Sequence, residues 1–398
     1  RRPPRSTLFP YTTLFRSIAR RSDNRIHMTR RGYLLVTRET KSDELLQQLY
    51  AGYGAQAAKL IRLHEGASRG YVPPHSADWQ TAPDGVDVLL GRDLIQPHYP
   101  TFDKEVSTAL HIRRAGDISG QQLGQYMLET MRPLGAQFQQ AKVVGLAKAD
   151  RFAVEVLADG VRQTIRADII VNAAGPFAAQ VAAMHGERLP IVNVLQQKIA
   201  FADRNRAVDR KMPFAIDLDG QTLAWSDDER AELAAAPEFA RLLAPMPGSI
   251  HCRPDGGDHG EWIKLGWAFN EEQITAPVRE PELNSYFPEV VLRAASRLQP
   301  RLAQYLAALP RDRVHYGGYY PMTKENWPLI GAAKTPGVFL ATALSGYGTM
   351  GACATGDLCA CAVVGAPVPA FARSLSLARY DDKALMDQLA ASESRGLL

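Results

Sequence analysis

The chain has 398 residues, of which 46% are hydrophobic and 22% charged, a composition typical of a globular protein long enough for two domains. No uncharged apolar run reaches the roughly 18 residues of a membrane span, and the N-terminus lacks the apolar core of a signal peptide, so we expect a cytoplasmic protein without an integral membrane segment. The four cysteines have neither the spacing of a disulfide framework nor that of a zinc site, which predicts small buried residues and no metal.

Residues 1–17 show neither a helical nor a strand period. Translated back into DNA, this segment resembles a sequencing-adapter oligonucleotide, so we interpret it as an artefact and expect it to be disordered. It contains four arginines (Arg1, Arg2, Arg5 and Arg16) and no acid, and without them the formal net charge falls from +4 to zero. The charge therefore predicts no nucleic-acid or anionic-membrane partner.

Strand and helix patterns alternate along the rest of the chain. The first are a strand at 26–37, a helix at 42–63, a short helix at 91–96 and a strand at 107–114. Ser119 and Gln122 have the spacing of a capping box that begins the next helix. Further strands are predicted at 141–149, 152–158, 165–172, 193–202, 248–253, 261–269 and 338–344, and further helices at 226–243, 289–307 and after Gly348.

A glycine-rich turn lies between the predicted strand 338–344 and the last helix. Its glycines, Gly346, Gly348 and Gly351, have the spacing of a dinucleotide-binding turn. However, the second strand and the acidic residue of a first βαβ unit do not follow. The N–H groups of a helix N-terminus could still face an electron-rich ligand atom, while close packing of helix and strand is the alternative.

Three blocks of sequence carry a more specific resemblance. Residues 317–351 resemble the C-terminal flavin-binding signature of the glycine oxidase/D-amino-acid oxidase superfamily of FAD-dependent oxidoreductases, the DAO family, which also includes sarcosine oxidases. Residues 168–186 are similar to that family's strand, turn and helix beside FAD, and residues 111–128 to the strand and helix before them. The blocks follow one another in the order of the family, and the resemblance covers most of residues 26–380.

The resemblance implies an α/β (α+β mixed) fold with two interleaved domains. We expect a Rossmann-like FAD-binding domain at 115–190 and 319–380, a substrate domain with a mainly antiparallel sheet at 18–114 and 191–318, and a tail at 381–398. The family opens with a strand, a G-x-G-x-x-G turn and a helix, and nothing similar precedes Ile18. We therefore expect roughly the first 70 to 90 residues, including the first βαβ unit, to be missing. The strands 169–172 and 338–344 should then flank an exposed apolar gap.

The resemblance also implies which residues bind FAD. Val143 matches the valine whose backbone meets the adenine, and a tight turn of small residues lets the backbone approach the cofactor. The loop before the last helix matches the one whose N–H groups face the flavin pyrimidine edge. The expected cofactor residues are Val143, Ala173, Ala174, Gly175, Gly346, Gly348, Thr349 and Met350. Gly318 stands where monomeric sarcosine oxidases carry the cysteine that anchors flavin, so we expect non-covalent binding.

The substrate side departs from the family pattern. Many members have an arginine that holds the substrate carboxylate at the position of Tyr320, and tyrosine supplies no charge. Arg253 and Lys264, on predicted strands, are possible replacements, with solvated strand residues as the alternative. Tyr319, Tyr347 and Trp267 could wall the pocket, although core packing is the more common role for such a tryptophan. His251 has the pattern of a hydrogen-bonded sheet histidine more than that of a base.

These implications lead to an expected function. The leading hypothesis is an FAD-dependent oxidoreductase that oxidises the C–N bond of a small-molecule amine or amino acid by hydride transfer to flavin N5, with oxygen or a quinone-type molecule as electron acceptor. Because the substrate amine need only be neutral, no general base is required. The alternatives are a non-catalytic flavoprotein that acts as an assembly or binding factor, and an inactive fragment.

Overall fold

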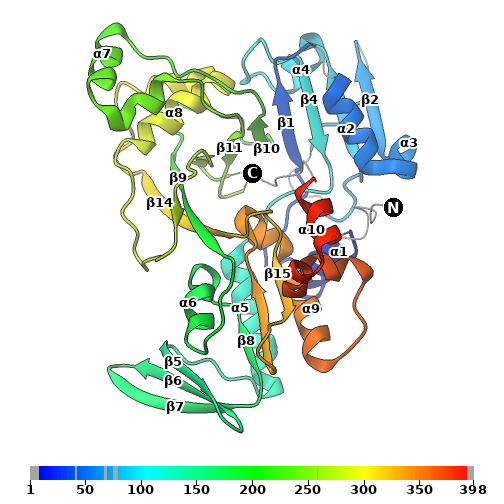
Figure 1. The fold of residues 1–398 in the computed structure, drawn as a ribbon. Coiled ribbons are helices and arrows are strands. Elements are labelled where there is room, and N and C mark those ends of the chain that lie inside the picture. Colours follow the sequence, from blue (N-terminus) through cyan, green and yellow to red (C-terminus); the bar gives the residue numbers. More distant parts are fainter. Residues whose placement is uncertain (1–8, 41–42, 67–69, 75–78, 258, 392–398) are drawn as a thin grey trace.

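The computed structural model describes residues 9–40, 43–66, 70–74, 79–257 and 259–391. This part of the chain forms one ten-stranded sheet and two three-stranded sheets, with helices packed on them. The large sheet occupies the upper part of Figure 1 and the two small sheets the lower part. The chain is therefore a mixed α/β protein, as the sequence predicts.

The large sheet combines two distant parts of the chain. Its strand order is β13-β9-β12-β11-β10-β1-β4-β3-β2, and β14 also pairs with β9. Its described pairs are antiparallel except for β1 with β10 and β2 with β3, which agrees with the expected mainly antiparallel sheet. The strands are β1 (Tyr33–Thr37), β2 (Ile61–Glu65), β3 (Val86–Leu90), β4 (Thr108–Ile112), β9 (Val192–Ala202), β10 (Phe214–Asp217), β11 (Ile250–Pro254), β12 (Trp262–Trp267), β13 (Gln273–Ile274) and β14 (Val314–Met322).

One face of this sheet holds the largest hydrophobic core. Helix α8 (Phe287–Leu298) packs on β9, β11 and β12. Its Val290 and Val291 are fully buried against side chains such as Leu265 and Trp267. Each such side chain gains about 1.5–3 kcal/mol on burial. Because strand side chains alternate between faces, the residues between these core positions point to the opposite face.

The two small sheets lie below the large one. The first has the order β15-β16-β8, with β15 (Leu329–Ala332), β16 (Val338–Thr342) and β8 (Ile170–Asn172), and α9 (Gly348–Val364) packs on β15 and β16. The second consists of β5 (Lys142–Lys148), β6 (Phe152–Ala158) and β7 (Val161–Ala167). The remaining α-helices are α1 (Phe9–Arg21), α2 (Asp43–Tyr53), α3 (Ala57–Leu60), α4 (Arg92–His98), α5 (Gly120–Met131), α6 (Ala178–Ala183), α7 (Asp227–Ala235) and α10 (Lys383–Ala390).

The expected gap between the strands 169–172 and 338–344 is not there. β8 and β16 pair directly and in parallel, with Ile170 opposite Val338. The exposed apolar side chains are instead Ile169 (44% exposed) and Val171 (47% exposed), which alternate with the half-buried Ile170 and point to the other face of the sheet. The prediction of an exposed apolar gap between these two strands was wrong.

The expectation of disorder at residues 1–17 is wrong from Phe9 onward. Residues 1–8, and the side chains of residues 9–13, lie outside the described part of the chain. Helix α1 lies against α9, and Phe15 is half-buried in a cluster with Ile18 and Ala19. Positions i, i+3 and i+4 share one face of a helix, so these three side chains form an apolar stripe that can cover apolar surface.

Other expectations differ from the structure in detail. The predicted helix 42–63 ends early, because Ile61–Glu65 pairs with β3 as a strand. The sequence pattern did not predict β3, β10 or β14. The capping residue of α5 is confirmed, since Ser119 Oγ accepts a hydrogen bond from the Gln122 backbone at 3.3 Å. The large sheet continues through Met322, so the expected domain boundary at 318/319 lies inside β14.

Candidate active site

The carboxyl ends of β8 and β16 bring two predicted cofactor segments together. The strands are parallel, with Leu340 opposite Asn172, so the turns that follow them leave the sheet at the same edge. Thr342 Oγ1 at the end of β16 donates a hydrogen bond to the Gly175 carbonyl at 3.4 Å. Ligands of parallel sheets characteristically bind at this edge.

The turn after β8 is held by Asn172. The Asn172 side chain donates to the Ala178 carbonyl at 2.9 Å and accepts from the Ala174 backbone at 3.3 Å. Gly175 has φ of +54°, a conformation that favours glycine, and a Cβ built there meets nothing within 4 Å. The turn of Ala173, Ala174 and Gly175 thus presents bare backbone to open space.

The loop after β16 is strained and ends in an open helix terminus. Ala343 and Ser345 both have positive φ, at 59° and 50°, and such strain often marks a functional site. Helix α9 begins at Gly348 without a side-chain cap, and Thr349 and Met350 are exposed. The N–H groups of Gly348, Thr349 and Met350 are therefore free to meet a ligand, with the positive end of the helix dipole behind them.

Ser345 adds an orphaned polar group to this loop. Its Oγ is buried and has no hydrogen-bond partner among the described residues. An unpaired buried hydroxyl costs free energy unless a ligand or water satisfies it. The Ser345 hydroxyl, the open helix terminus and the bare turn at Gly175 together fit a ligand that forms hydrogen bonds through several groups. The isoalloxazine and pyrophosphate groups of FAD have this property.

Tyr320 connects the large sheet to this loop. Strand β14 contacts both the 3₁₀ turn Gly175–Phe177 and the 3₁₀ turn Ser345–Tyr347. The Tyr320 ring lies so close to Gly346 that a Cβ there would be 2.6 Å from Tyr320 Cε2. Glycine at 346 is thus required by close approach. Burial raises the pKa of Tyr320, so its hydroxyl stays protonated.

Tyr319, which was expected to wall the substrate pocket, lies on the face of β14 opposite to Tyr320. Its hydroxyl accepts a hydrogen bond from the Val278 backbone at 3.2 Å. Neighbouring residues of a strand point to opposite faces, so only one of the two tyrosines can reach Gly346. The structure therefore removes Tyr319 from the candidate site.

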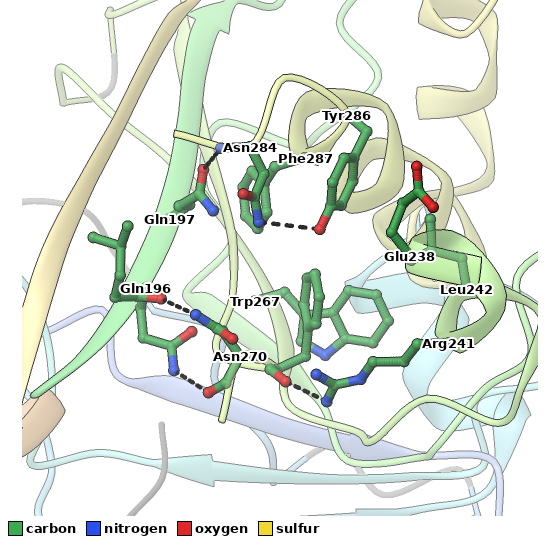
Figure 2. Close-up of a pocket in the computed structure, with 12 residues that line it drawn as sticks. Gln196, Gln197, Glu238, Arg241, Leu242, Trp267, Asn270, Asn284, Tyr286 and Phe287 are labelled. Carbon is green, nitrogen blue, oxygen red and sulfur yellow. Dashed lines mark hydrogen bonds between the residues drawn. The ribbon is translucent and has the colours of Figure 1, made fainter. Parts of the chain in front are cut away.

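Trp267 also lies away from the site. It is buried under α8, packs on Phe269 and donates from Nε1 to the Gly248 carbonyl at 3.0 Å. A cavity of about 60 Å³ lies on this face of the sheet, lined by Trp267, Phe287 and the amides of Gln197 and Asn284 (Figure 2). Because Tyr320 points to the opposite face, this cavity is separate from the candidate active site.

The Tyr347 side chain is bonded to a neighbouring loop, and Val143 lies in the small sheet formed by β5, β6 and β7. The Tyr347 hydroxyl donates to the Asn326 carbonyl at 2.7 Å, and burial raises the pKa of Tyr347 to about 12. It therefore ties the loop 345–350 to the segment 323–327. Val143 lies beside a bulge at the start of β5, and β5 packs on α6, the helix that follows the Gly175 turn.

The segment 323–327 is fixed by an arginine that the sequence analysis missed. Arg379 is fully buried and forms a salt bridge with Glu325. It also donates to the carbonyls of Pro328 at 2.6 Å and Trp327 at 3.0 Å. This contact joins the C-terminal part of the chain to the loop that Tyr347 holds.

The two cations considered as possible replacements for the missing arginine already have partners. Arg253 lies 3.0 Å from Asp117 and 3.1 Å from Asp255, and Lys264 lies 3.0 Å from Asp255. Both do point to the same face as Tyr320, since Arg253 pairs with Lys264 across β11 and β12. Their charge is nevertheless balanced by two carboxylates.

Lys198 and His251 occupy the same face, and sequence reasoning missed Lys198. Burial, with the nearby cations, lowers the pKa of Lys198 and lowers that of His251 to about 3. His251 Nδ1 lies 3.3 Å from the Ser249 carbonyl, so the neutral ring donates there. Its Nε2 is then an acceptor, buried and without a partner among the described residues.

The described residues offer neither a membrane-spanning helix nor a metal site. In the described part of the chain, no helix is long and apolar enough to cross a membrane. Those same residues contain no cluster of three or more histidine, cysteine or acidic side chains suited to a metal ion.

Comparison with known proteins agrees with this geometry. Residues 11–362 match the family model described as DAO, FAD dependent oxidoreductase. D-amino acid dehydrogenase 3 of Mesorhizobium japonicum is 27% identical over 218 residues, 54% of this chain and 42% of that protein. The chain thus spans less than half the length of this curated relative.

Solved structures show the same fold. Glycine oxidase from Geobacillus kaustophilus matches with a TM-score of 0.63 at 15% identity, over 94% of this chain and 81% of that one. Iminodiacetate oxidase from Chelativorans sp. BNC1 matches with a TM-score of 0.62 at 20% identity, over 90% and 79%. The chain therefore shares its fold with these two enzymes. The chain belongs to the DAO family of FAD-dependent oxidoreductases.

Proposed function

We propose that this chain oxidises the C–N bond of an amine or amino acid with non-covalently bound FAD. The observation that carries the proposal is the uncapped N-terminus of α9 beside the Gly175 turn, with Tyr320 against the same loop. A bare turn, free N–H donors and an adjoining sheet face are the parts that a flavin site needs. Family membership supports the choice of FAD.

Each cofactor residue has a physical task in this proposal. When bound, FAD supplies a two-electron acceptor at flavin N5. The N–H groups of Gly348, Thr349 and Met350 would hold its pyrimidine edge and would stabilise negative charge there, as preoriented donors do in an oxyanion hole. Gly346 leaves room for Tyr320. The turn Ala173–Ala174–Gly175 and the backbone of Val143 would hold the remaining length of the cofactor.

The substrate would lie on the sheet face that carries Tyr320 and Arg253. Oxidation removes a hydride from the carbon that bears the amine, and the resulting imine is hydrolysed by water. The chain's task is to orient this C–H bond and to exclude competing water. Tyr320 can donate one hydrogen bond to the substrate, because its raised pKa keeps the proton on the oxygen. The electron acceptor of the proposed reaction is oxygen or a quinone-type molecule.

Anaerobic flavin bleaching tests the proposal. FAD is added to the full chain, and glycine, D-alanine, iminodiacetate and benzylamine are added in turn while the flavin absorbance is followed. We expect at least one of these amines to bleach bound flavin. If FAD binds, and dithionite but none of a wider amine panel reduces it, the non-catalytic binding role replaces the proposal.

A further inference from the structure

The cavity on the α8 face of the large sheet has a size suited to a small molecule. Its lining comes from β9, β12, α8 and the 3₁₀ helix Pro237–Leu243 (Figure 2). Its volume is about 60 Å³. A buried water needs about 10–15 Å³, so the space holds about four to six waters, or an organic molecule with about that many non-hydrogen atoms.

One buried side chain on the wall offers a hydrogen-bond donor without an acceptor. Gln197 on β9 is 3% exposed, and its Oε1 accepts from the Asn284 backbone at 3.0 Å and lies 2.9 Å from His315 Nε2. Because a backbone N–H can only donate, Oε1 must face Asn284, and the amide nitrogen takes the other end of the group. Among the described residues, Gln197 Nε2 donates no hydrogen bond. An acceptor inside the cavity would satisfy it.

Two opposite charges stand at the exposed rim of the cavity. Glu238 and Arg241 are three residues apart on the 3₁₀ helix, so their side chains leave it on the same side. Arg241 donates to the Phe269 carbonyl, and its guanidinium carbon lies 5.5 Å from the centre of that ring. Among the described residues, Glu238 has no ion pair. Figure 2 shows the two charged groups pointing in different directions, so each is open to a ligand.

The rest of the wall is aromatic. Trp267 and Phe287 are each 1% exposed and line the cavity, so they can pack on the apolar part of a ligand. A guanidinium and an amide N–H suit a carboxylate, and a carboxylate suits an ammonium group. A simple anion or a simple cation would leave one of the rim charges unmatched. A small molecule that carries both charges matches them together.

We propose that this cavity binds a small zwitterion of the amino-acid class, with its carboxylate at Gln197 and Arg241 and its ammonium group at Glu238. Gln197 and Tyr320 point to opposite faces of the paired strands β9 and β14, because Gln197 is opposite Gly317 while Tyr320 is opposite Val194. The bound zwitterion is therefore an occupant of a second, non-catalytic site. The inference does not depend on the proposed oxidation.

The indole N–H of Trp267 reports on the cavity. The full chain is labelled with ¹⁵N, supplied with FAD and reduced with dithionite, so that glycine cannot be oxidised. The Trp267 signal is assigned by its loss in Trp267→Phe. Glycine is the probe, and acetate and methylamine each carry one of its two charges. We expect glycine to shift the Trp267 signal and to bind about 10-fold more tightly than either control, the effect of one added hydrogen bond to a charged group.

Variants test the amide and the two charges. Gln197→Glu keeps the oxygen that accepts the backbone N–H but replaces the donor with a charged acceptor, so glycine binding should weaken by about 10- to 100-fold. Arg241→Met and Glu238→Gln should each weaken it by about 2- to 5-fold, since both charges are exposed. Arg230→Met and Glu232→Gln, at exposed positions of α7 that do not line the cavity, are the matched controls and should change nothing.

Three results would overturn the inference. The first is a Trp267 signal that glycine does not shift. The second is binding of acetate or methylamine as tight as that of glycine. The third is unchanged glycine affinity in either Arg241→Met or Glu238→Gln, two exposed positions that keep the test decisive if Gln197→Glu does not fold.

Discussion

At the scale of single residues, the Tyr320 ring leaves no room for a side chain at position 346. In Gly346→Ala, the new Cβ overlaps the Tyr320 ring, so the loop or the ring must move. We expect a loss of about 1–3 kcal/mol in the free energy of unfolding. Gly356→Ala in α9 is the matched control, because its Cβ meets open space and alanine favours the helix by about 1 kcal/mol. Urea unfolding of both variants checks the prediction, and equal midpoints would contradict it.

The two neighbouring tyrosines offer a second matched pair. Tyr320→Phe removes a hydroxyl on the site face, and Tyr319→Phe removes one that is bonded to Val278. We expect only Tyr320→Phe to raise the half-saturating concentration of a bleaching substrate, by about 2- to 10-fold for one neutral hydrogen bond. A larger effect for Tyr319→Phe would place the substrate on the wrong face of β14.

Residues predicted from a contiguous motif were found together, while residues that depend on distant partners were not predictable. Gly175 and Gly348 lie in turns whose strands are adjacent and parallel, as the order of the motifs implies. Lys198 could not be found from the sequence, since its neighbours come from β11, β12 and β14. Tyr319 could have been excluded from strand alternation alone, had Val314–Met322 been recognised as a strand.

At the scale of elements, the Arg379–Glu325 pair joins the C-terminal segment to the loop beside α9. Arg379→Met leaves Glu325 as an unpaired buried charge, and we expect a loss of about 3–5 kcal/mol in the free energy of unfolding. The double variant Arg379→Met/Glu325→Met should recover part of that loss, because no charge remains buried. Chemical denaturation of the single and double variants checks this; additive losses would show that the pair does not interact.

Elements were predicted well where the local pattern and the tertiary contacts agree. Ser119 caps α5 as its sequence spacing predicts. Ile61–Glu65 continues a helical pattern in the sequence, but pairing with β3 makes it a strand. Helix α1 was predicted to be disordered from the origin of its sequence, yet its apolar stripe packs in a cluster with Ile26 and Trp79. In both cases burial against distant residues outweighs the local signal.

At the scale of the whole molecule, two buried histidines link stability to pH. Burial lowers the pKa of both His111 and His251 to about 3, whereas an unfolded histidine titrates near pH ~6.5. Between these values the unfolded chain binds more protons, so stability is complete above pH ~6.5 and falls as the pH drops toward 3. Each histidine contributes up to about 1.4 kcal/mol per pH unit.

Urea midpoints measured between pH 7.5 and 4.5 check this dependence. Most carboxylates remain ionised over that range, so histidines dominate the slope. His251→Gln should reduce the slope, because the buried neutral histidine is then gone. A midpoint that does not change with pH in the unmodified chain would show that neither histidine is held neutral.

The central claim is that the turn 173–175 and the loop 346–350 together hold FAD. Hydrogen exchange of the full chain, with and without FAD, tests it most directly, because it reports on the backbone N–H groups themselves. The account predicts that FAD slows exchange at Gly348, Thr349 and Met350 and also at Ala174 and Gly175. Protection of other segments, with no change at the turn 173–175 and the loop 346–350, would contradict it. Protection of only the turn or only the loop would also contradict it.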